Sequence, residues 1–141
     1  MQDRPTGGDR RGTFTELSTE ECYRKLSQAV GIGRIGLCTS DGPLVLPVNY
    51  LVDGETLLVR TAPYTVIAEH ASGPVALEVD DLEPALKFGW SVLVVGEASR
   101  VEDVEEMVEL RTSGRLEPWA EGTRGFFIRI TPRGVTGRQI G

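Results

Sequence analysis

The hydrophobic pattern near the start of the chain has the period of a helix. Cys22, Leu26 and Ala29 lie four and three positions apart, as on one face of an amphipathic helix. Ser18 and Glu21 precede this face with the spacing of a capping box. The pattern predicts a helix that begins after Ser18 and ends near Ala29.

After Gly31 the pattern changes to short strand-like runs separated by glycine and proline. Gly42 and the pair Asp53-Gly54 mark tight turns, and Pro43 is expected to end strand pairing. Pro47 lies inside an apolar run, which predicts an edge or a bulge because proline donates no backbone hydrogen bond. The predicted strands cover residues 34–39, 44–51, 56–61, 75–79, 88–100 and 126–130, with 135–140 as a seventh candidate.

The remaining segments complete the predicted order of elements. The run from Val92 to Val95 is continuously apolar, which indicates burial on both faces of its strand. Residues 80–84 are acidic and are expected to form a loop. Short helices are predicted over 66–71, capped by Thr65, and over 103–110, capped by Asp103.

This order of elements indicates an antiparallel α+β domain that is mainly β. Strands this short and numerous favour a barrel, because closure removes exposed strand edges. Residues 1–13 are polar without apolar periodicity, and we expect a disordered N-terminal tail there. A chain of 141 residues is expected to form one domain, which we assign to residues 14–141.

Composition excludes several kinds of chemistry. The chain has a single histidine, His70, and two cysteines without C-x-x-C spacing, which argues against a zinc site. No nucleophile elbow, P-loop or dinucleotide fingerprint is present. The net charge of −6 disfavours nucleic acid and anionic membranes as partners. No apolar run is long enough to span a bilayer, and no secretory signal is evident, so we expect a reduced, cytoplasmic protein.

Charge is distributed unevenly along the chain. Residues 111–141 hold six arginines against two glutamates, so the negative charge lies in the preceding residues. One interpretation is an acidic, solvated body with a compensating C-terminal segment. The other is that these arginines supply positive potential for a small anionic ligand.

Two segments carry residue types that suit a ligand. In Arg60-Thr-Ala-Pro-Tyr-Thr65 a strand ends and a helix begins, so two threonine hydroxyls, an arginine and free helix N–H groups could cradle a phosphate. The alternative is an ordinary turn with a threonine cap. Trp90 and Ser91 open an apolar strand, where they belong to the core or flank a planar ligand.

Other candidates are weaker. Trp119 lies in a loop and covers either a pocket or the core, and Asn49 could bond a heterocycle edge. Cys38 is interpreted as a small core residue, and His70 has no evident carboxylate partner. No acid–base pair stands out and no catalytic residue is assigned, so a bound cofactor would have to supply any redox reactivity.

Together these segments resemble the pyridoxamine 5'-phosphate oxidase-like, FMN-binding split-barrel superfamily, and most closely its short actinobacterial-type members. The resemblance covers roughly residues 17–140. It rests on Val30–Gly36, Leu46–Tyr50, Arg60–Thr65, Glu78–Asp81, Gly89–Gly96, Pro118-Trp119, Ile130–Pro132 and Val135–Arg138.

The resemblance implies a six-stranded split β-barrel with peripheral helices, and a homodimer with its flavin sites at the subunit interface. It implies an oxidoreductase that acts on a small-molecule substrate, or else a non-catalytic flavin carrier or sensor. By position in the motifs, Pro47, Val48 and Asn49 would lie along the isoalloxazine, and Trp90 and Ser91 would border it. Arg60, Thr61, Thr65 and Val66 would lie at the phosphate and ribityl chain, with Trp119 and Arg124 reaching across from the other subunit.

One position departs from the family pattern. Many relatives place a lysine directly after the threonine at position 65, where this chain has Val66. Loss of a charge-assisted partner for phosphate costs about 1.5–3 kcal/mol. FMN is the expected cofactor, with the deazaflavin F420 or haem as alternatives.

Overall fold

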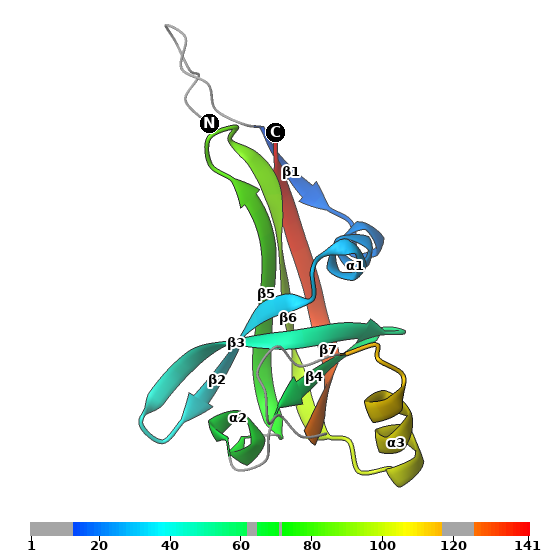
Figure 1. Cartoon of the computed structure of the whole chain (residues 1–141). Coiled ribbons are helices and arrows are strands. Elements are labelled where there is room, and N and C mark those ends of the chain that lie inside the picture. Colours follow the sequence, from blue (N-terminus) through cyan, green and yellow to red (C-terminus); the bar gives the residue numbers. More distant parts are fainter. Residues whose placement is uncertain (1–12, 62–64, 71, 117–125) are drawn as a thin grey trace, which may run out of the picture.

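Seven antiparallel strands form one sheet whose hydrogen bonding closes into a ring (Figure 1). The computed structural model describes residues 13–61, 65–70, 72–116 and 126–141, so all of the predicted tail except Thr13 lies outside the described residues. The strand order is β1-β7-β4-β3-β2-β5-β6, and β6 also pairs with β7. Six strands therefore close the predicted barrel and β1 lies outside it. The strands are β1 (Phe14–Leu17), β2 (Ile32–Thr39), β3 (Gly42–Asp53), β4 (Thr56–Thr61), β5 (Gly73–Glu83), β6 (Phe88–Arg100) and β7 (Phe126–Ile140).

In the described part of the chain three helices lie around the barrel, as predicted: α1 (Thr19–Gln28), α2 (Val66–Glu69) and α3 (Val104–Thr112). The capping box of α1 is confirmed, because Ser18 Oγ accepts from the amide of Glu21 at 3.1 Å and the Glu21 carboxylate accepts from the amide of Ser18 at 2.8 Å. The hydroxyl of Tyr50, inside the barrel, donates to the carbonyl of Leu26 at 2.7 Å. This bond fixes the buried face of α1 against β3.

Apolar side chains alternate between the interior and the exterior of the barrel. Along β6, Val92 and Val94 are fully buried, whereas Leu93 and Val95 are 41% and 40% exposed. The prediction of burial on both faces of this strand was therefore wrong, because the sheet has one core face. Cys38 likewise faces solvent rather than the core. A second, smaller cluster lies between β4, β7 and α3, and it comprises Leu58, Val101, Leu110, Leu116 and Phe127.

Several strands are longer than predicted. β5 continues through Glu83, so most of the expected acidic loop is strand, paired with β6 as far as Glu83↔Phe88. Pro43 does not end pairing, since it lies in β3 opposite Cys38. The two segments expected near the C-terminus form one continuous strand, β7. In each case pairing with a neighbouring strand extends an element beyond its apolar residues.

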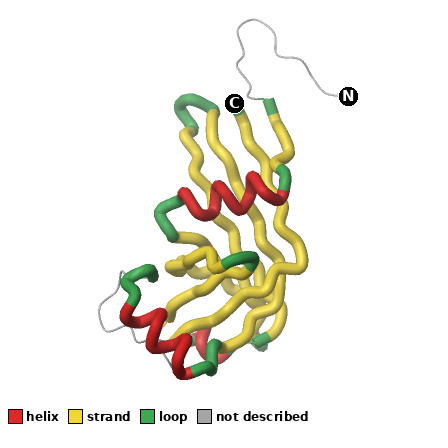
Figure 2. Tube along the Cα trace, turned by 90° about the vertical axis from the view of Figure 1, so that its right-hand side faces the viewer, coloured by secondary structure: helices red, strands yellow, loops and turns green. Residues whose placement is uncertain are grey.

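The junction of β2 and β5, which we call the seam, has the fewest register pairs of any junction in the ring. Only three register pairs join these strands, from Arg34↔Glu78 to Gly36↔Ala76. β4 pairs with β3 from Asn49 onward, so Pro47 has a strand on one side only. Its position confirms the edge environment expected for a proline. Beyond the barrel, β5, β6, β7 and β1 continue together as a twisted ribbon, which Figure 2 shows above α1.

Candidate functional site

The described candidate residues fall into two groups on the sheet. Pro47, Val48, Asn49, Arg60, Thr61, Thr65 and Val66 belong to β3, β4 and the start of α2, whereas Trp90 and Ser91 belong to β6. In the sheet order β2 and β5 lie between β3 and β6. Because the ring has six strands, β3 and β6 lie on opposite sides of it, about 14 Å apart when measured along the sheet. Trp119 and Arg124 lie outside the described residues.

The first group brings the two threonines together. Thr61 is buried at the end of β4, and its Oγ1 lies 3.2 Å from Oγ1 of Thr65. The Thr65 hydroxyl also accepts from the amide of Ala68 at 3.1 Å, as the N-cap of α2. Because α2 has only four residues, its dipole is small and the hydroxyls are the main polar groups there.

Arg60 and Asn49 pair in register, so their side chains lie on the same face of the sheet as Pro47, whereas Val48 faces the core. Arg60 Nη1 donates to the carbonyl of Leu116 at 2.9 Å, and its guanidinium lies 5.2 Å from the ring centroid of Phe127. Val48 is buried in the core, so only its backbone is available to a ligand. Pro47 is exposed and Asn49 is half-buried on the outer side of the barrel.

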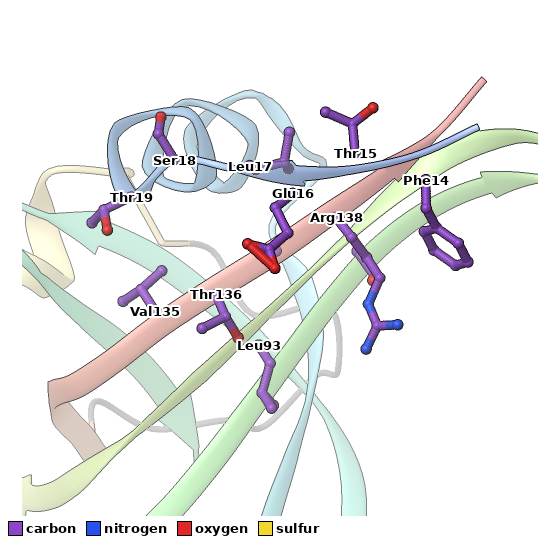
Figure 3. Close-up of a pocket in the computed structure, with 12 residues that line it drawn as sticks. Phe14, Thr15, Glu16, Leu17, Ser18, Thr19, Leu93, Val135, Thr136 and Arg138 are labelled. Atoms are coloured by element: carbon purple, nitrogen blue, oxygen red, sulfur yellow. The ribbon is translucent and has the colours of Figure 1, made fainter. Parts of the chain in front are cut away.

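In the second group, Trp90 belongs to the core, with Lys25 Nζ 5.9 Å from its ring centroid. Ser91 lines a hollow of about 770 Å³ between β1, β6 and β7 (Figure 3). We call this the Arg138 hollow. It is lined by Phe14, Thr15, Glu16, Leu17, Ser18, Thr19, Ser91, Leu93, Val135, Thr136, Gly137 and Arg138.

The Arg138 hollow contains two charged side chains, Glu16 and Arg138, which the sequence analysis did not single out as site residues. Ser91 pairs in register with Arg138, which pairs in turn with Glu16. Figure 3 shows the Glu16, Thr136 and Arg138 side chains on the same side of the sheet. Arg138 Cζ lies 5.6 Å from the ring centroid of Phe14. The C-terminal excess of arginine was the sequence signal that could have identified this residue.

A charged cluster lies between the two groups, at the seam of the ring. Arg34 Nη1 is 3.2 Å from Oε1 of Glu78 and 3.4 Å from Oδ2 of Asp80. Burial and the nearby Asp80 raise the pKa of Glu78 from its ordinary value of 4.5 to about 7, although Arg34 acts in the opposite direction. Glu78 and Asp80 lie two positions apart on one face of β5, but Arg34 joins them only when β2 pairs with β5, so the sequence alone did not reveal this cluster.

Apolar side chains surround this cluster on the outer side of the barrel. Register pairing places Val45, Arg34, Glu78, Leu93 and Ser91 on one continuous face of β3, β2, β5 and β6, which we call the outer face. On it, Val45 is 69% exposed, and Leu93 and Val95 are also exposed. Such a face is more apolar than a barrel surrounded by water requires.

The described part of the chain holds no group of three or more potential metal ligands. It also holds no helix long and apolar enough to cross a membrane.

Comparison with known proteins gives consistent matches over nearly the whole chain. The family described as pyridoxamine 5'-phosphate oxidase matches residues 18–139. The uncharacterised protein Rv0080 of Mycobacterium tuberculosis (strain ATCC 25618 / H37Rv) is 35% identical over 131 residues, which is 89% of this chain and 84% of that protein.

Two solved structures are similar at 30% identity. The FAD binding protein from Mycobacterium smegmatis matches 90% of this chain and 98% of its own, with a TM-score of 0.69. The conserved protein of unknown function DIP1874 from Corynebacterium diphtheriae matches 91% and 98%, with a TM-score of 0.74.

Proposed function

Since the chain belongs to the pyridoxamine 5'-phosphate oxidase family, we propose that it binds a flavin nucleotide and acts as an oxidoreductase. The similarity to an FAD binding protein supports the flavin. A bound flavin would supply the hydride or electron transfer. The protein would orient the ring and keep water from it.

We further propose that two copies of the chain build each flavin site. The observation that carries this proposal is the separation of the two groups of candidate residues by β2 and β5. A ring system lying against Pro47 and Asn49 of one copy would reach Ser91 only if a second copy supplied it. The exposed apolar residues Val45 and Val95 of the outer face suit burial against that second copy.

The residues present fit a flavin in kind. The paired hydroxyls of Thr61 and Thr65 suit the phosphate or ribityl oxygens, and the exposed Pro47 offers an apolar surface to the ring. Ser91 offers a hydroxyl beside it. FMN is our first candidate, and FAD is the second because the M. smegmatis relative binds it. Because position 66 is valine and not the lysine of many relatives, a terminal phosphate lacks one cationic partner here. This loss matters most for FMN.

The decisive experiment is native mass spectrometry of the purified protein, together with the absorption spectrum of the cofactor released from it. We expect a dimer carrying up to two flavins, with the released mass deciding between FMN and FAD. F420 or haem would appear as a different mass and spectrum. A colourless monomer that binds neither FMN nor FAD at about tens of micromolar would contradict the proposal.

A flavin carrier or sensor without turnover is the second candidate. The carboxylates of Glu78 and Asp80, on the outer face, are both engaged by Arg34. This engagement disfavours their use in acid–base chemistry and so favours a carrier or sensor. Reduction of the loaded protein by NAD(P)H or reduced F420, followed by transfer to an acceptor, would support the oxidoreductase. Stable loading without reduction by either donor would support the carrier.

A further inference from the structure

The Arg138 hollow gathers polar groups that the described residues leave unused. Across residues 13–61, 65–70, 72–116 and 126–141, the guanidinium of Arg138 has one partner, the ring of Phe14, and makes no side-chain hydrogen bond or ion pair. The hydroxyls of Ser91 and Thr136 and the carboxylate of Glu16 also have no side-chain partner in those ranges. Polar groups that converge on a cavity in this way are typical of a ligand site.

The guanidinium of Arg138 determines the chemistry of such a ligand. An arginine packed on an aromatic ring keeps its planar N–H donors available, and they match the two oxygens of a carboxylate. Glu16 lies next to Arg138 in the register, so the hollow holds one positive and one negative side chain. This balance favours a monoanion over a dianion such as phosphate, which Glu16 would repel.

The side chains that line the hollow indicate the polarity and the size of the rest of the ligand. Phe14 is 62% exposed and Leu93 is 41% exposed, so both can pack against an apolar body. A volume of about 770 Å³ suits a small molecule. Phe14 also lines a second, largely apolar hollow of about 580 Å³ with Leu82, Phe88 and Ile140, into which such a body could extend.

We propose that the Arg138 hollow binds a small monocarboxylate with an apolar body, and that this molecule is the substrate class of the flavin site. The carboxylate would meet Arg138, with Thr136 and Ser91 as further donors, and the apolar body would lie against Phe14 and Leu93. The role as substrate site rests on the proposed function, because Ser91 would then lie between this ligand and the flavin. The anion site itself does not depend on a flavin.

Benzoate and its neutral counterpart benzamide are suitable probes. Each is titrated into the full-length protein, with and without flavin, and the backbone amide shifts of Phe14, Ser91 and Thr136 are followed by NMR. We expect benzoate to shift these amides and to bind at least about tenfold more tightly than benzamide. Arg138→Gln should remove that preference, and Arg138→Lys should restore part of it.

Arg133→Gln is the matched control, because Arg133 lies on the same strand, is exposed, and pairs with Glu97 outside the hollow. It should bind benzoate like the wild type. Equal binding of benzoate and benzamide, no binding of either, or unchanged benzoate binding in Arg138→Gln would overturn the proposal. Loss of flavin in Arg138→Gln with benzoate binding intact would assign Arg138 to the cofactor instead. A protein that never binds flavin but prefers benzoate would refute only the proposed function.

Discussion

The guanidinium of Arg34 lies 3.2 Å from the carboxylate of Glu78, across the seam where β2 meets β5. Three register pairs join the strands there, so this contact supports the junction with the fewest register pairs in the ring. Asp80 approaches the same guanidinium, and the cluster therefore holds two carboxylates for one cation. Its charge depends on pH near neutrality.

We expect Glu78 to make stability depend on pH between about 4.5 and about 7. Its pKa is about 7 in the folded protein against an ordinary value of 4.5, so the folded state holds a proton that the unfolded state has released. Stability should therefore fall as pH rises through this window and level off above it. Because Glu78 is partly exposed, we expect a loss on the order of 1 kcal/mol, measured by urea unfolding at a series of pH values.

Glu78→Gln should unfold with a flatter pH profile, because its side chain does not titrate. Glu105→Gln, an exposed change of the same charge on α3, should retain the wild-type slope. Parallel profiles for wild type and Glu78→Gln would show that Glu78 does not retain its proton.

Among the partly exposed arginines that the structure describes, we expect Arg129 to contribute most to the free energy of unfolding. It donates to Asp53 at 2.9 Å and to Thr56 at 2.6 Å, and it pairs with Glu106 of α3. Arg129→Gln should lower the free energy of unfolding by about 2 kcal/mol, because several charge-assisted bonds are lost together. In contrast, Arg133→Gln should cost only a few tenths of a kcal/mol, since its pair with Glu97 is exposed. Equal losses would contradict this ranking.

Thr65→Ala should have two separable effects. Loss of the N-cap bond to Ala68 should destabilise the protein by about 1 kcal/mol, measured by thermal or urea unfolding. Loss of the hydroxyl beside Thr61 should also reduce the flavin content of the purified protein. Thr65→Ser keeps both functions and should behave like the wild type. Normal flavin content in Thr65→Ala would remove this hydroxyl pair from the cofactor site.

Val66→Lys tests the missing cation directly. Val66 begins α2 and packs against the main core, so the change should cost some stability. If phosphate binds beside Thr65, the added charge should tighten FMN by about tenfold to about a hundredfold. Val66→Gln provides a neutral control with similar loss of packing. Equal affinities for the two variants would place the phosphate elsewhere.

The fold was largely predictable because its local signals agree with its packing. Ser18 and Glu21 correctly predicted the start of α1. Gly42 and Gly54 marked turns that the structure contains, and both glycines have a positive φ. β1 was missed because its four residues are stabilised mainly by pairing with β7, far away in the chain. Asp80 was assigned to a loop because an outward-facing strand residue looks the same in the sequence as a loop residue.

The candidate site was less predictable for the same reason. Side chains such as Arg34 and Glu78 are 44 residues apart and meet only across the seam. Arg138 and Glu16 meet through the pairing of the first and last strands. No local spacing carries this information. The two threonines could be found because they are four residues apart in the sequence.

The long strand β7 also has a consequence for how the protein is made. It pairs in turn with β4, β6 and β1, and it is the last described element to be synthesised. The ring therefore stays open on the ribosome until β7 emerges, with the edges of β4 and β6 unpaired. β7 must pair with both β4 and β6 to close the ring, and then with β1 from the start of the described chain, so the last steps join distant segments and should be slow. Nascent chains that lack β7 are the ones we expect chaperones to hold.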